Sequence, residues 1–499
     1  MLMEKYRGMT EIFKDMNILV VGLARSGVGA ANLLSALGAR VTVTDSKPRG
    51  LLQDGIRRLA PSVRVITGGG ARGVFDESGM IVISPGVPAD IAPLSRARDK
   101  GIPVIGELEL AWRVIRRPFI AVTGTNGKST VTTLVGMMLK ESGFTTVTGG
   151  NIGNALTEEI VKTVGGRDRE TEDFRLPAVN SRFTAVDYIV AEVSSFQLES
   201  IDTFRPEIAA ILNITPDHLD RYGGMEDYID AKARIFENQA PEDRLVLNAD
   251  DPEVRRLESA RLKAGGRGPR VFHFSRQAEV EGVYCRDGAV YCNLPDSPPS
   301  LLIGIDEIRI KGTHNLENAM AASLCALLAG CSHGTVRDVL KSFPGLEHRL
   351  EPVGEINGVK FINDSKGTNT GAVAGSLKGL ENVILIMGGT DKGGDFSSLR
   401  EPVRAKVKCL ILMGEAREKI FRALGGETET HMASGLAEAV ELSMSKASPG
   451  DVVLLSPGCA SFDMFEDFAD RGRKFREAVR GIMNSHPLSR RRAIRGVEP

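Results

Sequence analysis

Short apolar runs recur along the whole chain and alternate with segments of helical character. Most of these runs end in a small or polar residue. The pattern is typical of parallel strands that are buried on both faces and carry functional loops at their carboxyl ends. The runs lie at residues 18–21, 41–43, 80–83, 119–122, 188–191, 208–212, 383–387, 409–412 and 452–455.

The runs fall into three α/β blocks, as expected for 499 residues, which are too many for one hydrophobic core. We predict a Rossmann-like domain at residues 1–107, a central ATP-binding domain with a P-loop at 108–346, and a second Rossmann-like domain at 347–499. The polar segment 165–185 reads as a surface insertion. The arginine-rich stretch 489–499 reads as a frayed tail rather than a nucleic-acid patch.

Composition limits which partners and which cellular compartment can be expected for the protein. A formal net charge of -1 provides no field that would recruit nucleic acid or an anionic membrane. No apolar stretch is long enough to span a bilayer, and the first residues do not resemble a signal peptide. The six cysteines contain no CxxC pair and suggest reduced thiols. We therefore expect a cytoplasmic protein, as a monomer, that binds neither nucleic acid nor membrane.

The strongest local signal is the segment Gly124-Thr-Asn-Gly-Lys-Ser-Thr130, which lies between an apolar strand and a helical stretch. Glycines allow backbone N–H groups to converge on phosphate oxygens, and the helix N-terminus adds positive potential. Lys128 would reach the β- and γ-phosphates, and the Ser129 hydroxyl would bind Mg²⁺. Val122 replaces the first Gly of the Walker A pattern, so the loop is a shorter GxxGKS form. A glycine turn before a helix is the structural alternative.

Two strand ends near this loop offer metal ligands. Glu192 ends the run 188–191, and His218 follows the run 208–212. Phosphoryl transfer needs Mg²⁺ and positioned charge, so we predict that both side chains are ligands. The alternatives are an acid that stabilises a helix N-terminus for Glu192 and a structural imidazole for His218.

The first block carries a degenerate dinucleotide fingerprint, Gly22-Leu-Ala-Arg-Ser-Gly27, in which Ala24 replaces the middle Gly. Asp45 ends the next strand, and Ser84 opens another loop at a strand end. This turn could serve dinucleotide redox chemistry, hold a nucleotide-linked substrate with Asp45 near the ribose or base, or be a plain βα turn.

In the third block, three loops follow apolar runs and carry lysines or a serine. They contain Lys366 and Thr368, then Lys392, then Ser461 at what we predict to be the start of a helix. Such groups suit carboxylate binding. Capping of helices is the alternative role for each of them.

Together these motifs resemble the Mur ligases of peptidoglycan synthesis over nearly the whole chain, in the branch that adds D-glutamate. Further carriers are Glu192-Val-Ser-Ser-Phe-Gln197, His314-Asn-Leu-Glu-Asn318, His348-Arg349, Asn363-Asp-Ser-Lys-Gly-Thr-Asn369 and Ser456-Pro-Gly-Cys-Ala-Ser-Phe-Asp463. The Asp-Asn-Pro-Arg signature of the diaminopimelate-adding relative is absent. Gly367 and Gly458 stand where this family would have Ala.

The resemblance implies an ATP-dependent ligase that joins D-glutamate to UDP-N-acetylmuramoyl-L-alanine through an acyl phosphate. It implies that the uridine-diphosphate end is bound by Ser26, Asp45, Ser46 and Ser84, and the muramoyl-alanine part by Asn151 and Ser194. It implies that ATP is bound by the loop residues Gly124, Thr125, Asn126, Gly127, Lys128, Ser129 and Thr130 together with Asn315, Asn318, Arg349 and Asp364. It implies that D-glutamate is bound by Lys366, Thr368, Lys392, Ser461 and Phe468.

Lys232 takes a role from the resemblance alone, because its sequence surroundings are those of an exposed helix lysine. The resemblance implies that CO₂ converts it to a carbamate, a ligand of a second Mg²⁺ shared with His218. The other functions to weigh are a different Mur-type ligase, a folylpolyglutamate-type ligase without the N-terminal uridine block, and a nucleotide-gated binding protein that performs no ligation.

Overall fold

The computed structural model describes residues 12–70, 72–151, 155–164, 166–167, 174–175, 185–218, 221–263, 268–295, 298–391 and 393–485. Contacts divide the chain into two compact bodies. The first body comprises Met1–Ile214, Tyr228–Ile308 and Glu317–Ser342, and the second comprises Thr215–Asp227, Arg309–Leu316 and Phe343–Pro499. In the part of the chain that the structure describes, no helix combines the length and the apolar character needed to cross a membrane.

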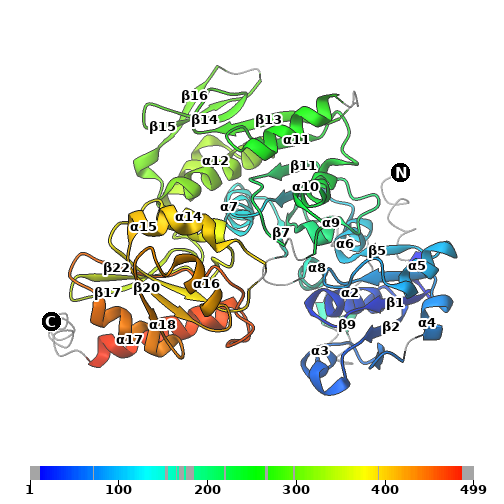
Figure 1. Ribbon diagram of the computed structural model, residues 1–499. Helices are drawn as coiled ribbons and strands as arrows, with labels where there is room; N and C mark the ends of the chain where they lie inside the picture. Colours follow the sequence, from blue (N-terminus) through cyan, green and yellow to red (C-terminus); the bar gives the residue numbers. More distant parts are fainter. Residues whose placement is uncertain are drawn as a thin grey trace, which may run out of the picture. The chain divides into compact units, whose positions relative to one another are not determined.

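The first body begins with a five-stranded parallel sheet in the order β3-β2-β1-β4-β5 (Figure 1). Its strands are β1 (Asn17–Val21), β2 (Arg40–Asp45), β3 (Arg64–Thr67), β4 (Met80–Ile83) and β5 (Val104–Gly106). The helical segments are α2 (Arg25–Ala36), η1 (Arg49–Leu52), α3 (Gln53–Arg57), α4 (Arg72–Glu77), α5 (Ala92–Asp99) and α6 (Glu107–Ile115). Both β1 and β4 are buried almost throughout, as the apolar runs predict.

The first body also contains a nine-stranded sheet in the order β16-β15-β14-β13-β12-β11-β6-β10-β7. Its strands are β6 (Phe119–Thr123), β7 (Thr146–Gly150), β10 (Tyr188–Glu192), β11 (Ile208–Ile211), β12 (Arg244–Asn248), β13 (Arg270–Ser275), β14 (Gly282–Arg286), β15 (Ala289–Asn293) and β16 (Ser300–Gly304). Pairing is parallel from β7 to β14, and β14, β15 and β16 continue the sheet in antiparallel fashion.

The helices that accompany this sheet are α7 (Lys128–Glu141), α8 (Leu156–Val164), α9 (Ser195–Leu198), α10 (Met225–Ala233), η3 (Arg234–Phe236), α11 (Pro252–Lys263), η4 (Ile305–Glu307), α12 (Thr313–Leu328) and α13 (His333–Ser342). Helices α10 and α12 each cross the division between the two bodies. Within the predicted insertion 165–185, the structure describes a short antiparallel pair, β8 (Gly166–Arg167) with β9 (Phe174–Arg175).

The second body is built on a six-stranded sheet in the order β17-β18-β22-β19-β20-β21, antiparallel only at β17. Its elements are β17 (Glu351–Ile356), β18 (Val359–Asn363), α14 (Thr370–Leu377), β19 (Val383–Gly388), η5 (Phe396–Leu399), α15 (Arg400–Lys406), β20 (Val407–Met413), α16 (Arg417–Leu424), β21 (Glu429–Met432), α17 (Leu436–Lys446), β22 (Val452–Leu455) and α18 (Phe468–Ser485).

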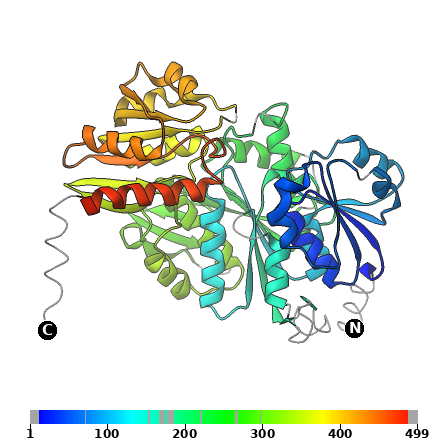
Figure 2. The same cartoon turned by 90° about the horizontal axis from the view of Figure 1, so that it is seen from below.

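Separate apolar cores cover the two faces of this C-terminal sheet. One contains Ile384, Ile386 and Phe475 and lies under α17 and α18. The other contains Leu385, Leu410 and Phe396 and lies under α14, α15 and α16. Figure 2 shows α18, in red, running along β17. Alternate residues of a strand point to opposite faces, so a strand with a core on each side must be apolar throughout.

The three parallel-rich sheets confirm the predicted α/β class, and each of the nine apolar runs coincides with a strand. The tail 489–499 lies outside the described residues. The domain limits at residues 107 and 346 stay predictions, since the compact bodies follow a different division of the chain.

Candidate active site

The predicted phosphate loop connects β6, which lies between β10 and β11 in the central sheet, to α7. Gly124 and Gly127 have φ values of 150° and 85°, a region that favours glycine. A Cβ at position 127 would lie 2.1 Å from Oδ1 of Asn318. The loop backbone thus requires glycine at both points, and a phosphate can approach its N–H groups closely.

Asn213, just after β11, fixes the shape of this loop. Its carbonyl oxygen accepts the Thr125 N–H at 2.9 Å. Its side chain accepts the Asn126 N–H at 2.8 Å and donates to the Asn126 carbonyl at 3.1 Å. These bonds hold the loop open, and they assign to Asn213 a supporting role that its sequence position alone does not indicate.

Two lysine ammonium groups converge on a single carbonyl oxygen of the loop. Nζ of Lys128 donates to the Gly124 oxygen at 2.8 Å, and Nζ of Lys232 donates to the same oxygen at 3.1 Å. Lys128 also donates to the Thr125 oxygen at 2.9 Å. Two cations so arranged create a strongly positive region beside the N-terminus of α7, where a polyphosphate would be stabilised.

The expectation of an exposed Lys232 is wrong. Lys232 is only 1% exposed, and its ammonium lies 4.4 Å from the centroid of the Tyr228 ring, one turn earlier in α10. The Tyr228 hydroxyl is 3.2 Å from Oγ1 of Thr125. A lysine in a polar helix is therefore drawn inward because the phosphate loop supplies a carbonyl acceptor and the aromatic ring a cation–π contact.

Glu192 ends β10 as predicted and is 1% exposed. Its Oε1 accepts from Nδ2 of Asn151 at 2.8 Å, whereas its Oε2 is buried without a hydrogen-bond partner among the described residues. A buried carboxylate oxygen left unpaired is costly, and a cation would satisfy it. The carboxylate oxygen of Glu192 and the hydroxyl oxygen of the buried Ser129 are donors of the kind that Mg²⁺ prefers.

The other predicted residues near these strand ends have defined places. Asn151 follows β7, and Thr130 is buried in the first turn of α7. Ser194 caps α9, and its hydroxyl accepts from the Gln197 N–H at 3.3 Å in a capping box. Asn318 is buried in α12 against the phosphate loop.

The glycine turn of the first sheet is closed by side chains from neighbouring strands. A Cβ at Gly27 would lie 1.8 Å from the Gly22 oxygen. Oδ2 of Asp45 accepts the Leu23 N–H at 2.9 Å, and Oγ of Ser84 donates to the Gly22 oxygen at 3.2 Å. Ser26 is half-buried at the start of α2, and Ser46 is exposed. Asp45 and Ser84 thus both hold the glycine turn, and a role of these four residues in substrate binding stays a prediction.

A cavity of about 370 Å³ opens within the second body, at the carboxyl ends of β18, β19 and β22. His218, Thr368, Asn369 and Gly458 are among its lining residues. His218 has a φ of 57°, a left-handed conformation that is uncommon for residues other than glycine. The segment Thr215–Asp227 that carries it is held by Asp217, which accepts from Nδ2 of Asn369 at 3.0 Å.

Asp364, just after β18, is held by two serine hydroxyls. Ser376 and Ser456 donate to its Oδ2 at 2.8 Å and 2.7 Å. Burial raises the pKa of Asp364 to about 6, although the serine hydrogen bonds and the charge of Arg349 act in the opposite direction. A Cβ at Gly367 would lie 2.5 Å from that same Oδ2. Gly367, which stands where the resemblance implies Ala, therefore leaves room for the Asp364 carboxylate.

The positive charge of Arg349 affects the pKa of two nearby groups, Asp364 and His314. Burial lowers the pKa of His314, and the positive charges of Arg349 and Lys378 lower it further. Asn315, in the first turn of α12, donates from Nδ2 to the Lys311 oxygen at 2.8 Å. These residues all lie in the second body.

A residue that the sequence analysis missed holds the strand-end loops together. Arg471 of α18 is fully buried, and burial lowers the pKa of its guanidinium to about 10. It donates to Oγ and the carbonyl oxygen of Ser365 at 3.0 and 2.8 Å, to the oxygens of Cys459 and Ala460, each at 3.2 Å, and to that of Gly388 at 3.4 Å. An arginine four residues into an amphipathic helix gives no sequence signal of this role.

Two of the residues predicted to bind D-glutamate are in contact. Nζ of Lys366 lies 3.8 Å from the centroid of the Phe468 ring. The prediction that Ser461 opens a helix is wrong. Ser461 is buried in a turn in which its carbonyl oxygen accepts the Phe465 N–H at 2.9 Å, and α18 begins only at Phe468. Asp467 caps the start of this helix instead, since its Oδ1 accepts the Asp470 N–H at 2.8 Å. Lys392 lies outside the described residues.

The fold and the glycine loop before α7 define a protein of the α/β class with a P-loop-like turn and two further parallel-rich sheets. Family comparisons agree with this description. The chain belongs to the Mur ligase family: residues 122–326 match the Mur ligase middle domain, residues 348–459 the Mur ligase glutamate ligase domain, and residues 16–106 the MurD-like N-terminal domain.

Two curated relatives of this chain have the same name. The chain is 45% identical over 472 residues to the UDP-N-acetylmuramoylalanine–D-glutamate ligase of Geotalea daltonii, covering 94% of this chain and 98% of that protein. It is 44% identical to the enzyme of the same name from Geobacter metallireducens, covering 93% and 97%.

Solved structures share the fold at lower identity. The UDP-N-acetylmuramate-alanine ligase MurC of Thermotoga maritima has a TM-score of 0.57 at 18% identity, with 94% of this chain and 100% of that chain covered. The folylpolyglutamate synthase of Mycobacterium tuberculosis has a TM-score of 0.52 at 16% identity, with 76% and 94% covered.

Proposed function

We propose that this protein is an ATP-dependent ligase that joins D-glutamate to UDP-N-acetylmuramoyl-L-alanine in the synthesis of the peptidoglycan precursor. The observation that carries the proposal is the identity of 45%, over 94% of the chain, to a ligase named for these two substrates. The phosphate loop with its two converging lysines supports the use of ATP. The match of residues 16–106 to a MurD-like N-terminal domain supports a uridine-nucleotide substrate.

The reaction we propose proceeds in two steps. A carboxylate oxygen of the L-alanine moiety attacks the γ-phosphorus of ATP, the bond to the bridging oxygen of ADP breaks, and an acyl phosphate forms. The amine of D-glutamate then attacks the acyl carbon, a proton leaves the nitrogen, and inorganic phosphate departs. The residues 124–130 hold the polyphosphate, and Lys128 neutralises the charge that develops during phosphoryl transfer.

We assign the metal ligands to Ser129, Glu192 and His218. Bound Mg²⁺ supplies Lewis-acid stabilisation of phosphoryl oxygens. The unpaired Oε2 of Glu192 supports this assignment on the first body. Asn151 positions the other oxygen of the same carboxylate, and Tyr228 fixes Lys232 beside the loop.

Lys232 is the fourth ligand that we propose, as a carbamate. CO₂ adds to the neutral amine, a proton is lost, and the ammonium becomes an anion with two oxygens. Lys232 and Lys128 donate to the same Gly124 oxygen, so conversion of one of them to an anion turns a repulsive pair into an attractive one.

The remaining assignments complete the proposed site. Ser26, Asp45, Ser46 and Ser84 contact the uridine-diphosphate end, and Asn151 and Ser194 contact the muramoyl-alanine part. Asn315 and Asn318 contact adenine, and Arg349 and Asp364 contact the ribose and phosphates. Lys366, Thr368, Lys392, Ser461 and Phe468 position D-glutamate. We place the domain boundaries near residues 107 and 346, and we propose a monomeric cytoplasmic enzyme that acts without nucleic acid or membrane.

The main competing function is that of a folylpolyglutamate-type ligase, because the Mycobacterium tuberculosis enzyme of that type has a similar fold. The two ligase types differ in the carboxylate they activate. The deciding experiment measures ADP and phosphate release with UDP-N-acetylmuramoyl-L-alanine against a panel of D- and L-amino acids, and repeats it with a folate acceptor.

We expect release that requires both the muramoyl nucleotide and D-glutamate, with the amide product detected by mass spectrometry. Release with the folate acceptor would assign the competing function. ATP binding without amino-acid-dependent phosphate release would reduce the protein to a nucleotide-gated binding module.

A further inference from the structure

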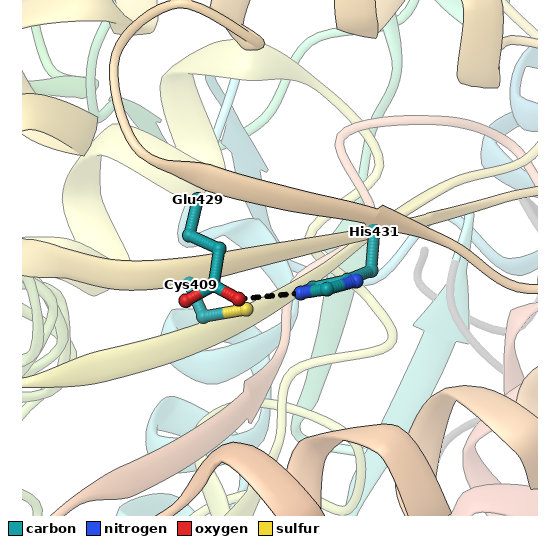
Figure 3. A group of neighbouring side chains, drawn as sticks. All are labelled: Cys409, Glu429 and His431. Carbon is teal, nitrogen blue, oxygen red and sulfur yellow. Dashed lines mark hydrogen bonds and ion pairs between the residues drawn. The ribbon is translucent and has the colours of Figure 1, made fainter.

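Three metal-ligating side chains meet at the outer edge of the C-terminal sheet, away from the strand-end loops of the second body. Cys409 comes from β20, and Glu429 and His431 come from β21, the edge strand of that sheet (Figure 3). Cys409 and Glu429 are register partners, and His431, two residues further, points to the same face. The ligand atoms of all three lie within 4.8 Å of one another.

A thiolate, a carboxylate and an imidazole are the donors that zinc prefers, and three protein ligands leave one tetrahedral position for water. The hard ions Mg²⁺ and Ca²⁺ select oxygen donors instead. We propose that Cys409, Glu429 and His431 form a Zn²⁺ site that is built from residues outside the ligase machinery.

The burial of the three ligands is graded in a way that suits ion entry. Glu429 is exposed, His431 is half-buried, and Cys409 lies at the bottom in the apolar core with Ile384 and Ile411. Solvent therefore reaches the site through the carboxylate and the imidazole. The apolar floor excludes water from the sulfur and strengthens a metal–thiolate bond.

Without a metal, the sulfur is a neutral thiol. Burial raises the pKa of Cys409 to about 11, and the charge of Glu429 adds to this effect. Coordination by Zn²⁺ deprotonates a thiol, so binding releases a proton. Proton release is thus a signature of Cys409 as a ligand.

A lysine competes with the ion for the same carboxylate. Nζ of Lys446, at the end of α17, lies 2.7 Å from Oε1 of Glu429, and Nε2 of His431 lies 2.8 Å from that oxygen. This hydrogen-bonded network is the metal-free alternative for the cluster. The Lys446 side chain is 34% exposed, so solvent screens its pair with Glu429 and the ammonium can turn into solvent.

Occupation of the site would link the edge strand β21 to β20 by bonds stronger than the ladder alone. An ion that binds only the folded protein stabilises it by mass action. Zn²⁺ should therefore raise the unfolding temperature of the second body, an effect that is separate from the Mg²⁺ requirement of the proposed ligase.

The test titrates the full-length protein with Co²⁺, a spectroscopic substitute for Zn²⁺, in excess Mg²⁺. We expect a thiolate-to-cobalt charge-transfer band that saturates at one equivalent, disappears on addition of Zn²⁺, and is accompanied by proton release. Cys409→Ser should remove the band and the proton release. Cys292→Ser, which removes a buried thiol of the first body, is the matched control and should retain both.

Two surface variants keep the test independent of core packing. His431→Gln should weaken Co²⁺ binding by at least about tenfold, the smallest loss typical even of an outer-shell partner. Lys446→Gln should tighten binding up to about fivefold, because it removes the competing ammonium. No band in the wild-type protein, or a band that survives in Cys409→Ser and His431→Gln, would overturn the proposal and leave the Lys446 network as the whole explanation.

Discussion

The carboxyl edges of the central sheet and of the C-terminal sheet handle charge in opposite ways. At the central edge, Lys128 and Lys232 direct two cations at one carbonyl oxygen, and one carboxylate oxygen of Glu192 has no hydrogen-bond partner within the described part of the chain. At the C-terminal edge, the guanidinium of Arg471 and the carboxylate of Asp364 are saturated by backbone and hydroxyl partners. The first edge offers groups that suit a polyanion and a metal, whereas at the second edge Arg471 and Asp364 are held by partners within the protein.

This contrast shows that topological position alone does not decide chemistry. Both edges collect loops where parallel strands end, as doubly wound sheets do. The side chains that back each loop then determine whether a strong field is left for the ligand.

Lys128→Ala should abolish turnover of ATP, with a loss of at least about a hundredfold in kcat, because a point charge on the transferring phosphoryl group disappears. The fold should be unchanged by circular dichroism. Lys140→Ala, at the exposed end of the same helix, is the matched control and should be fully active. Near-normal turnover in the Lys128 variant would remove the phosphate-loop assignment.

Lys232→Ala should be nearly inactive, since the proposed carbamate ligand is lost. A short exogenous carboxylic acid should restore part of the activity by occupying the vacated position. Lys232→Arg should respond less to the acid, because a guanidinium fills the same buried space with positive charge. A fully active Lys232→Ala enzyme would show that the buried ammonium only supports the loop.

Arg471→Lys should destabilise the second body by about 3 kcal/mol or more, because a buried ammonium cannot reach five acceptors spread over three loops. Denaturant unfolding measures the change. Arg473→Lys, whose side chain is half-exposed two residues later, is the control and should be neutral within error. Equal stability of the two variants would mean that the loops hold themselves without the clamp.

Ser461→Ala should raise the KM for the amino acid well above any change in the KM for ATP. The turn that contains Ser461 is buried and rigid, so loss of the hydroxyl should act on the carboxylate it contacts. Steady-state kinetics with each substrate varied in turn provides the measurement. A change confined to the ATP constant would move Ser461 to the nucleotide site.

Asp364→Asn should stabilise the protein slightly at neutral pH while reducing activity. Burial raises the pKa of Asp364 from its ordinary value of 3.8 to about 6 in the folded protein, so the folded state binds the proton more tightly. The carboxylate therefore costs nothing below pH 3.8, and its destabilisation grows from there to about pH 6. The gain from Asn should be about 1 to 3 kcal/mol at pH 7.5 and near zero at pH 4. Denaturant unfolding at the two pH values checks it.

The strands that bear these sites were predictable because each is a continuous apolar run, and the loops were predictable because glycines and a lysine follow the central run. The antiparallel extension β14–β16 was not predicted, since its strands carry partly exposed residues at their ends, such as Arg286 and Asn293, and lack the continuous buried run of a parallel strand.

The burial of Lys232 and Arg471 was beyond sequence reasoning for a different reason. Each sits in a helix most of whose other charged residues face solvent, and the acceptors that pull it inward come from loops distant in the chain. The Gly124 oxygen is 108 residues from Lys232, and the Ser365 hydroxyl is 106 residues from Arg471. Only the tertiary fold brings such acceptors to the helix.

The partners of Arg471 also bear on how substrate preference could change in evolution. Four of its five acceptors are main-chain oxygens, and only the Ser365 hydroxyl belongs to a side chain. A main-chain oxygen is kept when its side chain is substituted, so the bonds of Arg471 do not themselves restrict the side chains at 459–461. Because these three side chains are buried, only exchanges of similar size should be tolerated. A library that makes such exchanges and retains Arg471 should yield folded variants with new amino-acid preferences.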